Sequence, residues 1–158
     1  MTTLYLKQKV FTFLDKFTAK DEAENDKYFV QGHLAFGKEL EVFDSSGQSV
    51  AYIRQRLLSF LPRFEIEING KYVCTINRDL TFWGQSYSID DLDWHVKGDF
   101  LAHEYGLYDH TNNPIMEMRR VFFTWGDTYA LNIHDPEQEL ICFCITLAID
   151  ACIAVRRR

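Results

Sequence analysis

The side chains that could carry out chemistry are scattered along the sequence and match no catalytic signature. His103-Glu104 begins like a zinc-protease helix, but Leu107 stands where the second histidine would be needed. The segment 91–95 begins like a calcium-binding loop, but Val96 and Ala102 replace the glycine and the glutamate that such a loop requires. The sequence also lacks a Gly-x-Ser-x-Gly nucleophile turn and a glycine-rich phosphate loop. We therefore predict no catalytic residue, no metal site and no cofactor, and hence no enzyme.

Asp150 is the most unusual single residue, because 14 of the 16 residues in segment 140–155 around it are apolar. A carboxylate in such surroundings must be paired, hydrogen-bonded or neutral, since bare burial costs at least several kcal/mol. Thr146 lies one helical turn before it on the same face. We expect Asp150 to be a structural anchor that binds an Arg, a Tyr or a backbone N–H. The alternative is an acid with a perturbed pKa in a pocket at one end of the fold.

Several arginines could together hold a phosphate group. Arginine binds phosphate through paired N–H donors, so a convergent set would form a basic patch for a lipid head group. The alternative is that these charges lie on a solvent-facing surface and serve solubility alone. The terminal residues 156–158 are all Arg and match the negative end of a helix, with contact to an anionic membrane as a second hypothesis. The candidates are Arg54, Arg56, Arg119 and Arg120, with Arg63 nearby in sequence.

Composition and charge limit the class of protein. The 158 residues are 47% apolar and 25% charged, which is typical of a globular protein and excludes intrinsic disorder. We predict one domain over residues 1–158. The formal net charge is −6, and residues 80–158 carry 6 positive and 12 negative side chains. This acidic second half argues against nucleic-acid binding, which needs clustered Lys and Arg.

The N-terminus lacks the apolar run and the cleavage site of a secretory signal. We therefore expect a cytoplasmic protein, in which cysteines stay reduced. Cys74, Cys142, Cys144 and Cys152 form no CxxC pair, and their spacing matches no zinc site. They are predicted to be buried thiols.

Most of the chain alternates between apolar and polar residues, as in half-buried strands. Phe64, Ile66 and Ile68 alternate with glutamates, and Asn69-Gly70 then provides a hairpin turn. Similar turn residues divide the sequence into about a dozen short strands at the spacing expected of a sandwich or barrel.

The pattern changes after Ile133. Asp135 and Pro136 provide an N-cap and a first helical residue, so we predict a helix over about residues 136–155. This helix has no polar face and must be enclosed on every side. The prediction is a closed antiparallel β-barrel of about twelve strands that encloses one apolar C-terminal helix.

Several distinctive motifs follow one another along the chain. They are residues 44–47 (DSSG), 94–100 (WHVKGDF), 105–109 (YGLYD), 125–133 (WGDTYALNI) and 147–151 (LAIDA). Together these motifs resemble the LURP-one-related family in its short bacterial form, over nearly the whole chain. The resemblance implies a tubby C-terminal-like barrel of about twelve strands around a buried helix.

The resemblance also implies a distant relation to phospholipid scramblases, which act at membranes, and to tubby proteins, which bind phosphoinositide head groups. The basic lipid-binding segment of tubby is missing, so no site residue is carried over.

The resemblance and the missing catalytic motifs lead us to expect a non-enzymatic binding module of uncharacterised role. Its expected ligand is an anionic phospholipid head group at the inner membrane surface. Two alternatives stay open. One is a small-molecule carrier or small enzyme with a pocket at the barrel end near Asp150, and the other is an adaptor that binds a protein partner. The oligomeric state does not follow from the sequence.

Overall fold

The computed structural model of the chain describes residues 1–7, 16–35, 37–81, 84–123 and 126–156. This part of the chain consists of twelve β-strands followed by a 3₁₀ turn and one α-helix. The strands are β1 (Thr2–Lys7), β2 (Lys16–Lys20), β3 (Asp26–Ala35), β4 (Gly37–Asp44), β5 (Ser49–Gln55), β6 (Arg63–Ile68), β7 (Lys71–Thr81), β8 (Gly84–Asp90), β9 (Trp94–Asp99), β10 (Glu104–Asp109), β11 (Pro114–Phe123) and β12 (Gly126–Ile133). The helical elements are η1 (Pro136–Gln138) and α1 (Glu139–Arg156).

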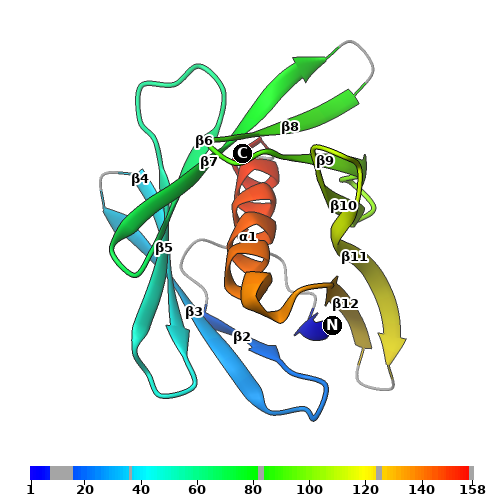
Figure 1. The fold of residues 1–158 in the computed structure, drawn as a ribbon. Coiled ribbons are helices and arrows are strands. Elements are labelled where there is room, and N and C mark those ends of the chain that lie inside the picture. Colours follow the sequence, from blue (N-terminus) through cyan, green and yellow to red (C-terminus); the bar gives the residue numbers. More distant parts are fainter. Residues whose placement is uncertain (8–15, 36, 82–83, 124–125, 157–158) are drawn as a thin grey trace.

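The strands form one antiparallel sheet that curls into a nearly closed barrel around α1 (Figure 1). Strands β1 to β8 pair in succession, β9 to β12 do the same, and β12 pairs with β1. The two edge strands, β8 and β9, follow each other in the chain and leave a single seam. Across this seam the rings of Tyr87 and Phe100 meet at 4.8 Å in an edge-to-face arrangement. The predicted twelve-stranded barrel is confirmed. At the seam, side chains rather than backbone hydrogen bonds between β8 and β9 close the barrel.

Alternation along the strands separates the core from the outer surface. Ile53 of β5 pairs with Ile66 of β6, and both point inward and are fully buried. Their neighbours in the ladder, Arg54 and Glu65, point outward. Because successive side chains of a strand point to opposite faces, the alternation seen in the sequence places every second residue against α1.

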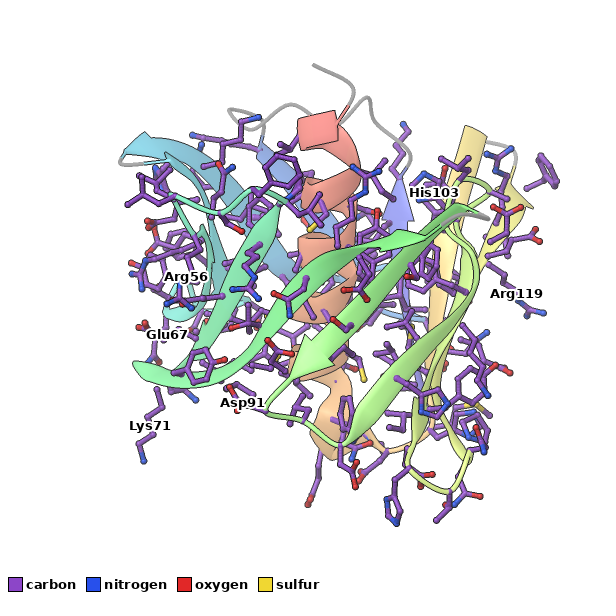
Figure 2. All side chains as sticks on the ribbon, turned by 90° about the horizontal axis from the view of Figure 1, so that it is seen from above. Arg56, Glu67, Lys71, Asp91, His103 and Arg119 are labelled. Carbon is purple, nitrogen blue, oxygen red and sulfur yellow. The ribbon has the colours of Figure 1, made fainter. Side chains whose placement is uncertain are left out.

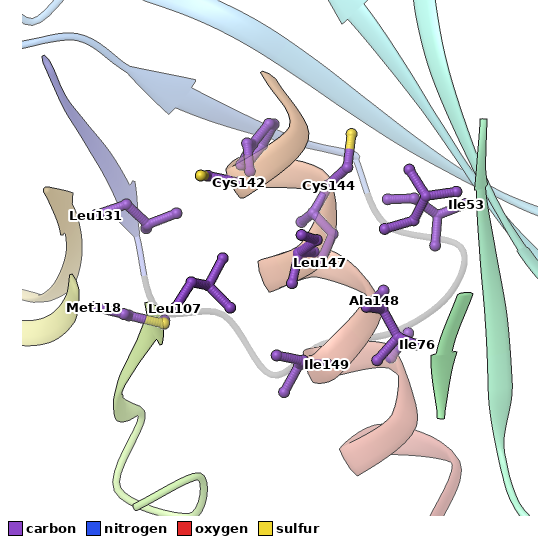
Figure 3. Packing of buried hydrophobic residues seen from close by; sticks show 14 of the residues in the cluster. Ile53, Ile76, Leu107, Met118, Leu131, Cys142, Cys144, Leu147, Ala148 and Ile149 are labelled. Carbon is purple, nitrogen blue, oxygen red and sulfur yellow. The ribbon is translucent and has the colours of Figure 1, made fainter. Parts of the chain in front are cut away.

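The apolar C-terminal helix predicted for residues 136–155 is confirmed as η1 followed by α1. Asp135 is its N-cap, and the carboxylate accepts a hydrogen bond of 3.0 Å from the backbone N–H of Glu137. The stretch Pro136–Val155 has a mean hydropathy of 1.9 and is long enough to cross a membrane, but 67% of its most apolar part is buried inside the protein. Figure 3 shows its side chains packed between Ile53 and Ile76 on one side and Leu107, Met118 and Leu131 on the other. The helix is therefore the core of the barrel.

All four cysteines are free and buried, as predicted. Burial raises the pKa of Cys74, Cys142 and Cys152 to about 12 and shifts the pKa of Cys144 in the same direction. Because the thiolate is the reactive form, these thiols act as small apolar core residues at neutral pH.

Antiparallel pairing sends successive connections to opposite ends of the barrel. α1 begins at the end that holds the turns at residues 21–25, 44–48, 69–70, 91–93 and 110–113. It finishes at the other end, where the connections at residues 56–62 and 100–103 lie (Figure 1). The two ends of the barrel can therefore be compared as separate surfaces.

Glu139 fastens the beginning of α1 to the barrel wall. Its side chain is buried, and it accepts hydrogen bonds from Thr2 Oγ1 at 2.6 Å and from the Tyr28 hydroxyl at 2.9 Å. The ammonium group of Lys27 lies 2.7 Å from Oε1 of Glu139. Three side chains from two strands of the barrel wall, β1 and β3, thus neutralise and hydrogen-bond one buried carboxylate, which compensates the cost of its burial.

We expect Glu139→Ala to lower the free energy of unfolding by about 3 kcal/mol, because it leaves the partly buried hydroxyl of Tyr28 and ammonium group of Lys27 without their partner. Equilibrium urea unfolding measures this change. Glu137→Ala is the control, since Glu137 is an exposed acid in the same first turn. Equal stability of the two variants would contradict the anchoring role of Glu139.

Candidate functional site

The arginines predicted to share a phosphate site lie on opposite sides of the barrel. Arg54 and Arg56 belong to β5 and the residue that follows it, whereas Arg119 and Arg120 belong to β11. Strands β5 and β11 are six positions apart in the twelve-stranded order. Figure 2 shows Arg56 and Arg119 on opposite sides of the helix. The structure therefore does not bring the four side chains together.

On the β5 side, the guanidinium groups are paired with carboxylates. Arg54 lies between Glu39 and Glu67, at 3.2 Å and 2.7 Å, and Arg56 lies 3.3 Å from Glu65. These cross-strand pairs occupy the outer face of β4, β5 and β6. Arg54 is the more enclosed of the two arginines, because it has an acid on either side.

Exposed apolar side chains gather at the end of the barrel where α1 finishes. Among the described residues, eight large apolar side chains are exposed. Four of them lie in the connections at this end, and a fifth lies near the end of β11. Leu58 is fully exposed, and Phe60 and Phe122 are 94% and 81% exposed. We call this surface the apolar end, and its members are Leu57, Leu58, Phe60, Leu101 and Phe122.

The loop between β5 and β6 is the most prominent part of the apolar end. Leu58 has a φ of +65°, a left-handed conformation that costs a branched, bulky side chain about 1 kcal/mol or more. Solvent exposure gives this side chain no compensating burial. The loop therefore presents a leucine outward at a position where glycine or asparagine would be easier to accommodate.

Basic residues accompany the apolar end. Arg56 and Arg63 are joined by a backbone hydrogen bond of 2.9 Å at the base of the β5–β6 loop. The exposed Arg119 and Arg120 come shortly before Phe122 in β11. The backbone of α1 also finishes at this end with Arg156, while residues 157–158 of the terminal arginine run lie outside the described part.

The opposite end carries aspartates that stabilise its turns, and we call it the acidic end. Asp21, Asp44 and Asp109 each accept hydrogen bonds from backbone N–H groups two and four residues later. The Thr111 hydroxyl and the backbone N–H of Asn113 lower the pKa of Asp109 to about 2. Hydrogen bonds from Ser46 and Asn25 likewise lower the pKa of Asp44 and of Asp21. These carboxylates are ionised at neutral pH, so the two ends differ in charge and in polarity.

Asp150 lies in the part of α1 nearest the apolar end and faces His103 in the β9–β10 connection. His103 Nδ1 is 3.5 Å from Asp150 Oδ1, and both side chains retain about a fifth of their surface exposed. The ring of Tyr129 lies 4.8 Å from the ring of His103. We define the Asp150 cluster as His103, Tyr105, Tyr129, Thr146 and Asp150. Its contacts connect α1 to β10, β12 and the β9–β10 connection.

Four polar atoms of the Asp150 cluster are buried and have no hydrogen-bond partner among the residues that the structure describes. They are His103 Nδ1, Tyr105 OH, Tyr129 OH and Asp150 Oδ1. Burial and the charge of Asp150 raise the pKa of Tyr105 well above its ordinary value, while the hydroxyl of Thr146 acts in the opposite direction. The Thr146 hydroxyl itself donates to the carbonyl of Cys142 at 3.0 Å. The cluster therefore combines two tyrosine hydroxyls, an imidazole and a carboxylate, with unused hydrogen-bonding capacity.

Sequence reasoning identified Asp150 but missed Glu139, the apolar end and the two tyrosines. A usable signal for the apolar end was the segment 57–61, which reads Leu-Leu-Ser-Phe-Leu between two strands where polar turn residues are usual. Tyr105 and Tyr129 alternate in phase with Leu107 and Leu131, so their inward direction could have been inferred. Their proximity to Asp150 depends on the order of the strands around the barrel.

Comparison with known proteins supports the same fold. A family model described as LURP-one-related matches residues 2–150. The chain is 38% identical over 151 residues to the uncharacterized protein YxjI of Bacillus subtilis (strain 168), covering 95% of this chain and 93% of that protein. It is also similar to the X-ray structure of the Arabidopsis thaliana protein AT5G01750, with a TM-score of 0.65 at 17% identity, covering 95% and 90% of the two chains. This likeness supports the tubby C-terminal-like barrel, and none of these descriptions assigns an activity.

We expect the double substitution Tyr105→Phe/Tyr129→Phe to change the free energy of unfolding by less than about 1 kcal/mol, because neither hydroxyl has a hydrogen-bond partner among the described residues. Tyr28→Phe is the comparison, since it removes a hydrogen bond to the buried Glu139 and costs about 2 kcal/mol. Both values follow from urea unfolding. A loss as large as that of Tyr28→Phe would mean that the two hydroxyls are bonded within the folded protein.

Proposed function

The chain belongs to the LURP-one-related family, and we propose that it is a non-enzymatic binding module that docks on anionic phospholipid membranes through its apolar end. The observation that carries this proposal is the concentration of exposed apolar side chains at one end of the barrel, with Leu58 and Phe60 at the tip of the β5–β6 loop. The expected location is the cytoplasm, at the inner membrane surface.

Apolar side chains that enter the interfacial region of a bilayer leave water, and this transfer is favourable. Burying a side chain such as Leu or Phe contributes about 1.5–3 kcal/mol. Leu58, Phe60 and Phe122 are almost wholly exposed in the free protein, so most of this gain is available on docking. The strained conformation of Leu58 keeps its side chain directed outward before the membrane is met.

Charge selects an anionic surface and orients the protein on it. Each Lys or Arg near an anionic bilayer contributes about 1 kcal/mol. Three of the four arginines predicted for phosphate binding, Arg56, Arg119 and Arg120, lie toward the apolar end, together with Arg63. The net charge of −6 opposes approach in general, but the acidic end points away from the membrane in this orientation. Arg54 is held between two glutamates and contributes least.

The test is co-sedimentation of the purified protein with vesicles of phosphatidylcholine alone and of phosphatidylcholine mixed with phosphatidylglycerol, over a series of salt concentrations. We expect binding to the anionic vesicles that weakens with salt. The double substitution Leu58→Asp/Phe60→Asp should weaken this binding at least tenfold, because it removes two inserting side chains and adds negative charge.

The matched control is Tyr72→Asp, which places a new charge on an exposed aromatic residue near the acidic end. Its binding to vesicles should equal that of the natural protein. Replacing Arg56, Arg63, Arg119 and Arg120 by Gln should reduce the salt dependence along with the affinity. Unchanged vesicle binding by Leu58→Asp/Phe60→Asp would refute the proposal. It would also be refuted if the natural protein binds no vesicles but associates with itself, and if the double variant abolishes this self-association.

A further inference from the structure

The Asp150 cluster is built like a site for a polar ligand. Buried polar groups in folded proteins are almost always hydrogen-bonded, and each one left unpaired costs about 1–3 kcal/mol. Here four such atoms come from α1, β10, β12 and the β9–β10 connection. Tyr105 and Tyr129 are more than nine-tenths buried. The charge of Asp150 acts on Tyr105, and the ring of Tyr129 packs against His103, which faces Asp150. Glu139, in the first turn of α1, has three hydrogen-bonding partners within the protein. Of the seven buried side-chain atoms without a partner among the described residues, four belong to the Asp150 cluster, and the others belong to Ser49, Asn77 and Arg78.

The chemistry of the Asp150 cluster selects hydroxyl groups. The phenols of Tyr105 and Tyr129 need an acceptor for their hydrogens, while the carboxylate of Asp150 needs a donor. A hydroxyl group donates and accepts at once and satisfies both. An ammonium group only donates and would leave the phenol hydrogens unpaired, and an anion would be repelled by Asp150.

Arg120 is the cation that lies beside Tyr129 of the Asp150 cluster. In the β11–β12 register it faces Tyr129, and it points to the barrel interior like Met116 and Met118. Its guanidinium carbon lies 5.9 Å from the centre of the Tyr129 ring, yet Arg120 itself is exposed. Arg120 therefore marks the rim above the Asp150 cluster, two residues before Phe122 of the apolar end.

The cluster also borders on solvent at the apolar end. His103 and Asp150 retain 19% and 20% of their side-chain surface exposed. The β9–β10 connection that carries His103 also carries the exposed Leu101. Figure 2 shows His103 on the same side of the helix as Arg119 of β11. A group held by the apolar end at the bilayer surface would therefore meet the cluster through His103 and Asp150.

We infer that the Asp150 cluster recognises the hydroxyl groups of a phospholipid head group, with its phosphate on Arg120. This inference rests on the proposed membrane docking and narrows its ligand to a phosphodiester that bears a hydroxylated substituent, such as phosphatidylglycerol. Tyr105 and Tyr129 donate to the head-group hydroxyls, and Asp150 accepts from one of them. The acyl chains stay in the bilayer beside the exposed side chains of the apolar end.

The experiment compares vesicles that contain equal fractions of phosphatidylglycerol or phosphatidylserine, which carry the same net charge but differ in hydroxyl and ammonium groups. We expect the natural protein to bind phosphatidylglycerol vesicles about tenfold more tightly, the effect of two hydrogen bonds. Tyr105→Phe/Tyr129→Phe should lower this binding to the phosphatidylserine level and leave phosphatidylserine binding unchanged. The matched control is Tyr108→Phe, because Tyr108 lies in the same strand as Tyr105 and points to its other face.

Calorimetry with soluble glycerophosphoglycerol separates a lipid head group from a free diester. Binding of this probe that is lost in Tyr105→Phe/Tyr129→Phe, together with the preference for phosphatidylglycerol, supports the inference. If the protein binds both vesicle types equally and the double variant does not change this binding, the inference about the Asp150 cluster is overturned. The proposed membrane docking is not affected by that result. If no vesicle is bound, the proposed docking fails, and probe binding would then reassign the cluster to a free diester. Failure of both probe and vesicles overturns both proposals.

Discussion

The burial of one apolar helix is the constraint on which the rest of this structure depends. α1 has apolar side chains around almost its whole circumference, and a helix of this kind is stable in water only when it is enclosed. Twelve strands provide the enclosure, and their alternating inward residues fill the space between wall and helix. The two carboxylates within α1 lie in its first turn and in its C-terminal half, where Glu139 meets polar groups of the barrel wall and Asp150 meets His103 of the β9–β10 connection.

The same topology divides the surface into two ends of different chemistry. In an antiparallel meander every second connection lies at the same end of the barrel. If these alternate connections share one kind of residue, that residue type therefore covers one end of the protein. The connections beside the start of α1 are tight turns whose aspartates bond their own backbone, as at Asp44 and Asp109. Those beside its end carry Leu58, Phe60 and Leu101 toward solvent. A protein polarised in this way can meet another surface in only one favourable orientation.

Local sequence signals accounted for much of this fold. Asp135 and Pro136 marked the start of the helix, and the alternation around Phe64 and Ile66 showed which residues face inward, because these features depend on neighbours a few residues away. The positions of strands around the barrel were not accessible in this way. The hypothesis that Arg56 and Arg119 share a site needed that order, which places them on opposite sides. The three partners of Glu139 are more than 110 residues away in the chain, so no local pattern indicated its role.

Glu139 and Asp150 show why one end of the helix is structural and the other is a candidate site. Both are carboxylates in an apolar helix, and both would lower stability if left alone. Glu139 has a cation, a phenol and a hydroxyl within hydrogen-bonding distance, which leaves it nothing to offer a ligand. Asp150 has two tyrosines in its neighbourhood whose hydroxyls have no hydrogen-bond partner of good geometry among the described residues. The fold provides every hydrogen-bond partner that Glu139 needs, and one more polar side chain near Asp150 would do the same there. The hydrogen-bond partners that are lacking around Asp150 can thus be provided by a ligand.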